Sequence, residues 1–384
     1  MRTASPAWAQ WPDRSEDDAY TLGVEEEVML LYPGSWSLAQ AVEQVLQRLP
    51  DDLRKHVFSE THSSAVEITS GVHQNVGDAV AELGLLRGKL HGVLSEIGLT
   101  AASSGTHPFA FWHDMRVSGA NRHQEVYGSM RALARREPTF ALHVHVGLAN
   151  PVSAVAAANQ MRAHLPLLLA LSANSPFWQG RDTGLASART PLFQAFPRVG
   201  IPRAFESYAE YVETVDLLIR GGAFPDHTFL WWDVRLQPRF GTVEVRIMDA
   251  QATLGQTAAL VALIQCLVRL EALEGYASST MLRAQEVLDE NRFLAARDGV
   301  DAEFIDPDRE CRVPVRDLLD PLLEACMPHA EALGCVGELD LVRRLVEEPG
   351  AERQRRLAGE DDDQRRLVAA LAGDFTPYPA HVSG

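Results

Sequence analysis

Three short strand-like segments carry ionisable residues at every second position, and this pattern most constrains how the chain can fold. The segments are Gly23–Glu27 (GVEEE), Leu142–Gly147 (LHVHVG) and Gly241–Arg246 (GTVEVR). Side chains alternate faces along a β-strand, so residues two positions apart project to one side, roughly 7 Å apart. Each segment therefore presents one pair of ionisable groups on one face, namely Glu25 with Glu27, His143 with His145, and Glu244 with Arg246.

The residues between these pairs are apolar. Leu22, Val24 and Val28 would face a core and leave Glu25 and Glu27 on the opposite side of their strand. If the three strands share a sheet, one of its faces is a surface of carboxylates and imidazoles. Such a face suggests a site for cations and polyanions, because an ordinary antiparallel sheet simply leaves its polar face to water.

Charge limits the classes of partner. The 384 residues carry a formal net charge of −17, and this excludes a general nucleic-acid binder, which needs clustered Lys and Arg. A nucleotide substrate remains compatible with acidity, because magnesium bridges carboxylates to phosphates. The length favours one large domain with an attachment, or two modest domains.

The sequence also predicts a cytoplasmic protein without a membrane segment. The first residues lack the pattern of a signal peptide, and the apolar run Leu165–Ala173 is too short to span a bilayer. The cysteines lack metal-knuckle spacing and are interpreted as reduced packing residues: Cys266, Cys311, Cys326 and Cys335.

Sequence periodicity predicts the order of the elements. Strands are expected over Tyr20–Leu31, His56–Glu60, Ala65–Thr69, Leu99–Ser104, Thr139–Gly147, Phe229–Leu236 and Thr242–Asp249. Helices are expected over Ser37–Leu49, Val76–Ile97, Arg122–Arg136, Asn150–Ser172 and Ser207–Arg220, and throughout the chain after Thr253. The strands do not alternate regularly with crossover helices, which indicates an α+β fold.

Each pair also has a plain structural interpretation. The acidic triplet could be a solvated strand edge, the two histidines could be core residues or zinc ligands, and Glu244 with Arg246 could be an ion pair. Zinc would need a third nitrogen or sulfur ligand, whereas the available acids suit magnesium or manganese better. Glycine-rich nucleotide signatures are absent from the sequence, so a nucleotide would be held by metal, arginines and the sheet face.

Taken together, the motifs resemble the second glutamate-cysteine ligase family, whose members are carboxylate-amine ligases related to the glutamine synthetase and guanidino kinase fold. The resemblance covers about residues 20 to 300. It is carried by the ordered motifs TLGVEEE (21–27), GTHPFA (105–110), LHVHVG (142–147), LALSANSPFW (169–178), DTG (182–184), SAR (187–189), WWDVR (231–235), GTVEVR (241–246) and ENR (290–292).

The resemblance implies an antiparallel sheet curved into a bowl, flanked by helices, with ATP and Mg²⁺ ions on its concave face. It implies metal ligands at Glu25, Glu27, Glu60, Glu67, His143, His145 and Glu244. It makes Arg246 a phosphate contact, Arg189 and Arg235 candidates for binding substrate carboxylate or phosphate, and Trp232 and Asp233 candidates for nucleotide binding. The pattern does not decide which of the two histidines faces the metals.

The resemblance also divides the chain. It implies a leader over residues 1–19, expected to be flexible, a catalytic domain over 20–300, a helical extension packed on it over 301–373, and a tail over 374–384. The chain departs from the family where Thr69–His73 reads TSGVH instead of continuing as TPVC, and where Arg297 and Asp298 precede Gly299 in place of an aromatic residue or histidine. The first departure puts cysteine as the acceptor amine in doubt.

The residue types fit this chemistry. Joining a carboxylate to an amine in water needs activation, and phosphoryl transfer from ATP produces an acyl phosphate. Carboxylate and triphosphate repel each other, so the site needs metal charge and arginines. The hypothesis is therefore an ATP- and Mg²⁺-dependent ligase, with Mn²⁺ as an alternative ion, that joins glutamate or a related acid to an amine, in a chain expected to form a homodimer. The rival hypotheses are a metal-dependent amide hydrolase and a non-catalytic binding homologue.

Overall fold

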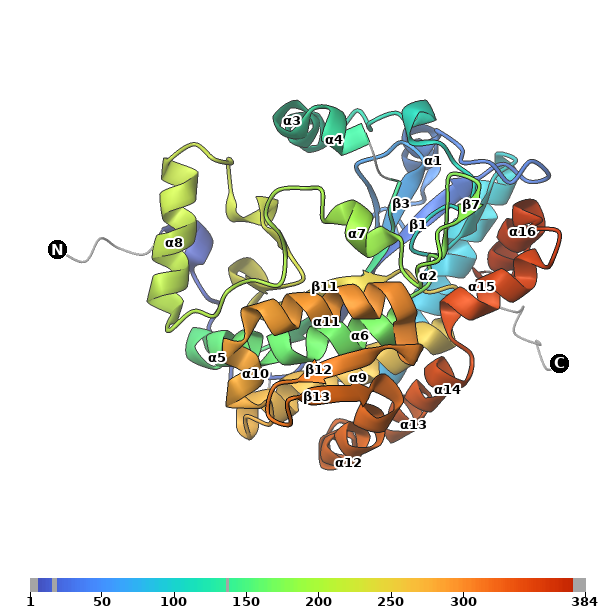
Figure 1. Cartoon of the computed structure of the whole chain (residues 1–384). Helices are drawn as coiled ribbons and strands as arrows, with labels where there is room; N and C mark the ends of the chain where they lie inside the picture. Colours follow the sequence, from blue (N-terminus) through green and yellow to red (C-terminus); the bar gives the residue numbers. More distant parts are fainter. Residues whose placement is uncertain (1–5, 16–18, 136–137, 376–384) are drawn as a thin grey trace, which may run out of the picture.

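The computed structural model describes residues 6–15, 19–135 and 138–375, and a seven-stranded antiparallel sheet runs through its centre (Figure 1). Strands follow the order β10-β11-β5-β1-β3-β2, and β4 pairs with the last residues of β1. The bounds are β1 (Leu22–Leu31), β2 (Val57–Ser59), β3 (Ala65–Thr69), β4 (Thr100–Ala102), β5 (Ala141–Gly147), β10 (Val234–Gln237) and β11 (Thr242–Asp249). The predicted α+β class is confirmed.

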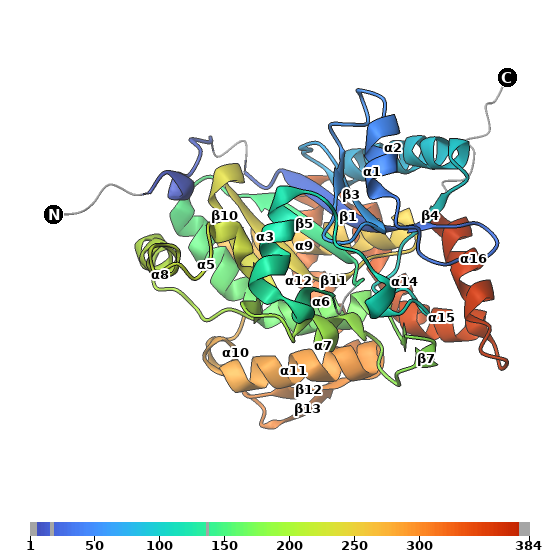
Figure 2. The ribbon, with the colours of Figure 1, turned by 90° about the horizontal axis from the view of Figure 1, so that it is seen from above.

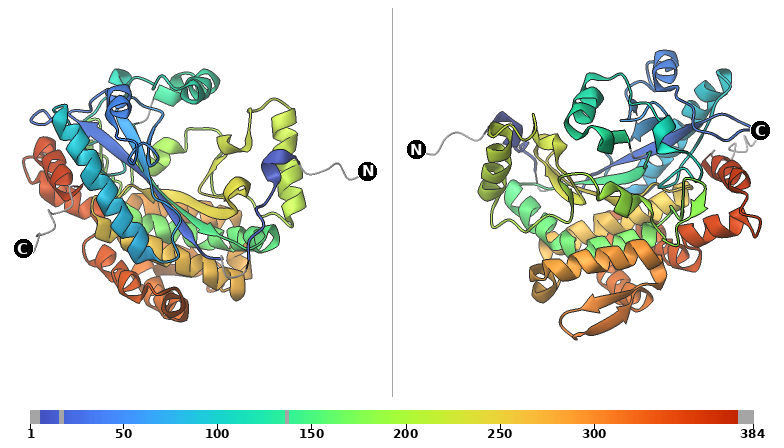
Figure 3. Two further views of the ribbon diagram at one scale, coloured as in Figure 1. Left: turned by 180° about the vertical axis from the view of Figure 1, so that it is seen from behind. Right: turned by 45° about the horizontal axis from the view of Figure 1, so that its top comes forward.

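Alternation gives this sheet two chemically different faces. The apolar face packs into the main core through Val24, Val28, Val66, Ile68, Leu142, Val144, Val146, Val243 and Val245. The opposite face, called the ionisable face below, carries the predicted pairs on the three neighbouring strands β1, β5 and β11. The views in Figure 3 show the twisted sheet with helices along one side and looser segments across the other.

Helices cover the apolar face. The central one, α9 (Leu254–Leu273), contacts α2 (Val76–Glu96), α5 (Pro151–Met161) and β5. It begins with a capping box in which the Thr253 hydroxyl and the Gln256 side chain each bond the other's backbone N–H. Among the described residues, α9 alone has the length and hydropathy of a membrane span, and 78% of that stretch is buried inside the fold.

An ion pair lies inside this helix-sheet interface. Glu26, between the two outward-facing acids of β1, receives Nε and Nη2 of Arg87 at 2.8 and 2.7 Å. The Thr257 hydroxyl donates to Glu26 at 2.8 Å, and the Arg87 side chain is fully buried. The middle acid of the triplet therefore ties β1 to α2 and α9.

The remaining helices surround the sheet. Their bounds are α1 (Val42–Arg48), α3 (Asn121–Met130), α4 (Ala132–Arg135), α6 (Leu165–Ser172), α7 (Arg189–Phe193), α8 (Tyr208–Arg220), α10 (Ser279–Arg283), α11 (Gln285–Asp298), α12 (Val315–Leu333), α13 (Val336–Asp340), α14 (Val342–Glu347), α15 (Gly350–Ala358) and α16 (Gln364–Phe375). Seen from above in Figure 2, α3 lies over the strands, whereas α12 and α9 lie behind them.

Short pairs of strands complete the loops. They are β6 (Phe177–Trp178) with β7 (Arg181–Asp182), β8 (Val199–Gly200) with β9 (Trp231–Trp232), and β12 (Glu303–Asp306) with β13 (Cys311–Pro314). The last pair corrects the expectation that everything after Thr253 is helical. In that hairpin Phe304 and Val313 are buried, so a short alternating pattern between two helices was overlooked.

Two predicted helices are interrupted, and one begins later than expected. The first break is at Arg131, whose φ of 52° ends α3 before α4 begins; Arg136, its expected end, lies outside the described residues. In the other, a 3-10 turn over Arg162–His164 separates α5 from α6, and Pro166 lies in the first turn of α6, where proline is tolerated. The helix expected from Ser37 begins only at Val42.

The residues of the predicted leader that the structure describes contact the rest of the fold. The Trp8 ring stacks on His227 with centroids 5.1 Å apart, and Tyr208 donates to the Ala9 carbonyl at 2.7 Å. At the other end, Phe375 of α16 is buried beside Arg87, with 4.6 Å between guanidinium and ring centre. The chain after residue 301 thus contributes to the main core, and residues 376–384 of the predicted tail lie outside the described residues.

Candidate active site

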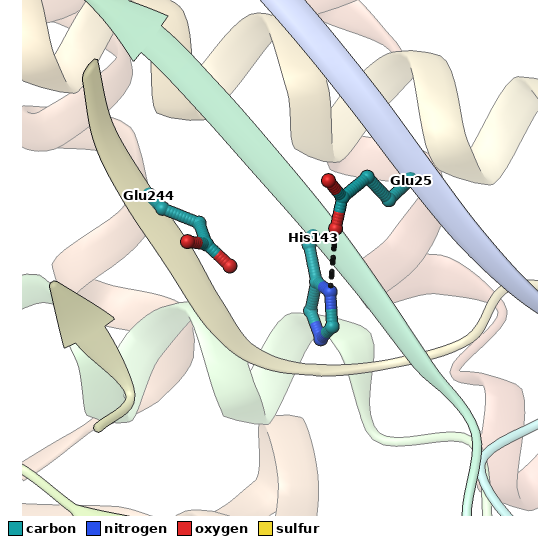
Figure 4. A group of neighbouring side chains, drawn as sticks. All are labelled: Glu25, His143 and Glu244. Carbon is teal, nitrogen blue, oxygen red and sulfur yellow. Dashed lines mark hydrogen bonds and ion pairs between the residues drawn. The ribbon is translucent and has the colours of Figure 1, made fainter. Parts of the chain in front are cut away.

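The predicted pairs meet on the ionisable face because β1, β5 and β11 are neighbours in register. Glu25 lies opposite His143, and Glu244 lies opposite His145. Ligand atoms of Glu25, His143 and Glu244 all lie within 4.8 Å of one another. Figure 4 shows these three side chains pointing toward one another from separate strands, with His143 Nδ1 at 3.1 Å from Glu25 Oε2.

A second cluster lies one step along the same strands. Glu27 of β1 is opposite Glu67 of β3, and ligand atoms of both lie with those of His143 within 4.8 Å of one another. His143 Nε2 is 3.8 Å from Glu27 Oε1, while the Ala141 backbone N–H donates to Glu27 Oε2 at 2.7 Å. One imidazole therefore lies between two groups of carboxylates.

The two histidines have different roles in this arrangement. Burial, together with the charge of Arg246, lowers the pKa of His143 to about 4, so its ring is neutral and one of its two nitrogens has a lone pair for a metal. Burial also acts to lower the pKa of His145, but the neighbouring Glu244 and Glu25 outweigh it and raise that pKa. His145 belongs to neither cluster, and its Nε2 lies 3.3 Å from Glu25.

The acids of the second cluster lack sufficient cationic partners. Burial and the nearby Glu60 raise the pKa of Glu27 to about 8. Burial, with Glu25, Glu60 and Glu27, raises the pKa of Glu67 well above its ordinary value. Crowded buried carboxylates with raised pKa values are what a divalent cation would stabilise, so the donor set fits a hard ion such as Mg²⁺.

Glu60 lines the cavity near these acids but is part of neither three-ligand cluster. Its Oε2 accepts from the Thr61 backbone N–H at 2.6 Å. The structure thus places Glu60 beside the metal-ligand candidates without joining it to them.

Two arginines converge on Glu244, which is fully buried. Arg235 donates Nε and Nη2 to the carboxylate at 2.7 and 3.1 Å, and its Nη1 donates to the carbonyls of Thr228 and Leu230. Arg246 Nη1 also pairs with Glu244, whereas its buried Nε has no partner among the described residues. Arg235 is therefore largely saturated, and Arg246 keeps capacity for a ligand.

Arg189 reaches the same cavity from the first turn of α7. Its guanidinium donates to the carbonyls of Ile247 and Arg246 at 3.0 and 3.3 Å and stands 5.7 Å from the centre of the Phe193 ring. The side chain is 5% exposed, and its Nε has no partner among the described residues. Arg189 thus bonds the backbone of β11 and lines the cavity.

These groups line one cavity of about 340 Å³. The predicted residues on its wall are Glu25, Glu27, Glu60, Glu67, His143, Arg189, Arg235 and Arg246. Sequence reasoning missed a further group on α3, in which Arg122, Val126 and Met130 recur every four residues and so share one helix face. That spacing was visible in the sequence, but nothing in it indicated that the face borders the ionisable strands.

The structure does not bring Trp232 and Asp233 to this cavity. Asp233 is 4% exposed and paired with Arg292 at 2.6 Å. Trp232 lines a separate small pocket with Phe205 and Tyr211. Both residues lie within the expected strand Phe229–Leu236, which the structure divides at Asp233 into β9, paired with β8, and β10, paired with β11.

A second cavity, of about 330 Å³, adjoins the first at Glu25, which lines both. Its walls are mainly apolar and include Val72 and Phe240, and His145 also lines it. Arg239 lies against it, its guanidinium 5.7 Å from the centre of the Phe240 ring. The ionisable face is therefore shared between a charged cavity and an apolar one.

Comparisons with known proteins agree with this architecture. A protein of Rubrobacter xylanophilus, provisionally named glutamate–cysteine ligase 2-1, is 41% identical over 94% of this chain and 96% of its own length. A protein of Sorangium cellulosum, provisionally named glutamate–cysteine ligase 2, is 39% identical over 89% of this chain and 92% of its own.

Solved structures support the fold. Glutamate–cysteine ligase of Francisella tularensis, crystallised with AMP, superposes with a TM-score of 0.67 at 12% identity, covering 96% of this chain and 91% of that one. A bifunctional glutathione synthetase of Pasteurella multocida gives 0.69 at 13% identity, with 94% of this chain and 52% of that longer chain covered. The sequence profile of glutamate-cysteine ligase family 2 matches residues 21–370, and the chain belongs to that family.

Proposed function

We propose that the protein is an ATP- and Mg²⁺-dependent ligase that joins the carboxylate of glutamate, or a related acid, to an amine. The observation that carries this proposal is the pair of carboxylate clusters sharing His143, with Arg246 and Arg189 on the same wall. Family membership and the provisional names of the relatives favour the same reaction class. An adenine nucleotide in the superposed Francisella enzyme is consistent with ATP as a substrate.

The residues suggest how the reaction is arranged. Mg²⁺ held by Glu25 and Glu244 and by Glu27 and Glu67, with the one lone-pair nitrogen of His143 in one of the two clusters, would neutralise the repulsion between triphosphate and carboxylate. Arg246 would meet phosphate oxygens with the part of its guanidinium that lines the cavity, while its Nη1 is held by Glu244. Arg235 would act as a positioning residue that fixes Glu244, since most of its donors are already used.

The two cavities would separate the substrates. The apolar cavity, with Phe240 and Val72 on its wall, suits a purine base, and Arg239 at its edge suits phosphate. The charged cavity suits an amino acid whose carboxylates need arginine partners. The transferred phosphoryl group would then lie near Glu25, the residue that lines both cavities.

Other features extend the proposal. Three of the four cysteines are buried as free thiols, as suits a reducing cytoplasm. Homodimer formation stays a prediction of the sequence, which sedimentation equilibrium would test.

The rival hydrolase needs a metal-bound water and no ATP. Each cluster contains one imidazole and two carboxylates. This donor set suits Mg²⁺ or Mn²⁺, but zinc also binds imidazole and carboxylate ligands, so the identity of the metal needs an experiment. The deciding experiment incubates the purified protein with ATP, Mg²⁺, glutamate and an amine mixture. Phosphate release that requires both substrates, together with a new amide detected by mass spectrometry, would support ligation. Amide cleavage without ATP would support the hydrolase, and nucleotide binding without turnover would support a binding protein.

A further inference from the structure

Part of the charged cavity has an apolar wall that phosphoryl transfer does not require. This wall, called the roof below, consists of Val126, Met130, Ala134, Phe193, Phe196 and Trp231. We propose that the accepted amine carries a branched aliphatic or aromatic group that packs on the roof. The inference rests on the proposed ligase function and names the class of its second substrate.

One side of the roof comes from α3. Val126 and Met130 are four residues apart and are 5% and 7% exposed, while Arg122, one turn earlier, is at the cavity rim and contacts Phe229 with its guanidinium 4.9 Å from the ring centre. An apolar helix stripe usually packs on other protein side chains. Here the stripe borders the cavity, opposite the strands that carry the acids.

The other side is aromatic and held in place. The Phe193 and Phe196 rings meet edge to face with centroids 5.2 Å apart. Arg198 stands 5.1 Å from the centre of the Trp231 ring, and Phe229 packs against the same ring at 5.9 Å. Rings fixed by such contacts form a preorganised apolar surface, which binds an apolar or aromatic ligand group at low entropic cost.

The amine is the substrate that suits this roof. The donor acid needs the arginines and the carboxylate clusters, and the purine base is assigned to the cavity of Phe240. Glu60 lines the charged cavity outside both clusters, so it offers a carboxylate for the ammonium group of the acceptor. With the ammonium at Glu60, the substituent of the amine would extend onto the roof.

The reaction balances with this placement. ATP transfers its γ-phosphoryl group to the donor carboxylate, which gives ADP and an acyl phosphate. The ammonium group loses one proton to Glu60 or to water, and the neutral nitrogen then bonds to the acyl carbon. As the carbon–oxygen bond to phosphate breaks, the second proton of that nitrogen passes to the departing phosphate, which leaves an amide N–H. A cysteine or glycine acceptor would leave most of the roof uncovered, whereas a leucine or phenylethyl group would bury it.

The first test compares amines at fixed glutamate, ATP and Mg²⁺, with the amide quantified by mass spectrometry and ADP by a coupled assay. The panel contains 3-methylbutylamine, 2-phenylethylamine and leucine, against glycine, ethanolamine, putrescine and cysteine. We expect kcat/KM for the best apolar amine to exceed that of glycine and ethanolamine by at least about tenfold. Preference for cysteine or a small polar amine overturns the roof proposal alone; no amide from any amine overturns the ligase proposal as well.

The second test uses variants. Phe196→Ala should lower kcat/KM for the apolar amine by about tenfold and leave the KM of ATP within about twofold. The matched control is Phe293→Ala, because Phe293 is an exposed aromatic residue of α11 that lines neither the charged nor the apolar cavity. This variant should change neither kcat/KM for the apolar amine nor the KM of ATP. If Phe196→Ala unfolds, Met130→Gln gives the second test, because glutamine has nearly the volume of methionine but is polar. This variant should also lower kcat/KM for the apolar amine. An increased KM for ATP in the roof variants would mean that the base binds there, and would overturn the proposal.

Discussion

The acidic triplet of β1 allows a test in which the same substitution is made on opposite faces of one strand. Glu26→Gln removes the negative charge from a fully buried ion pair, because Arg87 is 0% and Glu26 2% exposed. Glu27→Gln makes the identical change one residue later, on the ionisable face, where Glu60 and Glu67 crowd the carboxylate. We expect Glu26→Gln to destabilise the fold, and Glu27→Gln to abolish turnover without destabilising it.

The magnitude follows from the contacts. Removing one partner of a buried ion pair costs about 3–5 kcal/mol, and Arg87 keeps only its carbonyl partners at Ala252 and Gln251. The Glu26→Gln variant should lie at the lower end of this energy range, because the glutamine side chain keeps one oxygen that accepts from the Thr257 hydroxyl. With an unfolding entropy of about 2.1 cal/mol/K per residue over 384 residues, a loss of about 3 kcal/mol lowers Tm by about 4 °C. The raised pKa of Glu27 keeps its carboxyl largely protonated at neutral pH when no divalent cation is bound, so glutamine replaces a nearly neutral group and Tm without divalent cations should be unchanged or higher.

The assay is thermal and urea unfolding in EDTA, with ADP release measured separately at saturating Mg²⁺. A Glu26→Gln/Arg87→Met double variant should recover much of the loss, since it leaves no unpaired buried charge. A Glu26→Gln midpoint equal to wild type would refute the structural role of this acid. Wild-type turnover in Glu27→Gln would remove that residue from the site.

Three further outcomes are expected. Arg246→Lys should lower kcat on the order of tenfold to a thousandfold, because lysine keeps the charge but not the planar fork; a kcat within about twofold of wild type in the ADP-release assay would show that Arg246 only neutralises Glu244. Phe240→Ala should raise the KM of ATP about tenfold and not that of glutamate, and equal effects on both substrates would contradict the assignment of the base to that cavity. Burial lowers the pKa of His107 from 6.5 to about 4. The folded state therefore loses about 3 kcal/mol of stability as the pH falls from 6.5 toward 4, because the buried imidazole resists protonation while the unfolded chain takes up the proton. Urea midpoints across this pH range should fall more steeply for wild type than for His107→Gln, and parallel profiles would refute the assignment.

The predicted orientation of residues on the strands, which the structure confirms, depended on local geometry. The two-residue alternation of a strand is a property of the backbone, so the common orientation of Glu25 with Glu27, and of Glu244 with Arg246, needed no knowledge of distant contacts. The same holds for the helix starts at Asn150 and Ser207, whose side chains cap the first turn.

Errors arose where distant contacts decide the outcome. The two-residue spacing of Asp233 and Arg235 resembles that of the pairs on the ionisable face. In the structure, however, Asp233 forms an ion pair with Arg292 of α11 and does not line the charged cavity. The alternating residues of β12 and β13 were too few to stand out between helices, and the hairpin is stabilised by burying Phe304 and Val313.

The sequence by itself determined the chemistry on the strands, because residue type and two-residue spacing decide which groups a strand presents on each side. Only the tertiary structure decided how those groups are used. Strand register places His143, and not His145, in both carboxylate clusters. Packing from far along the chain pairs Glu26 with Arg87 and places α3 over the acids. These outcomes depend on contacts between residues distant in sequence, and local spacing carries no information about them.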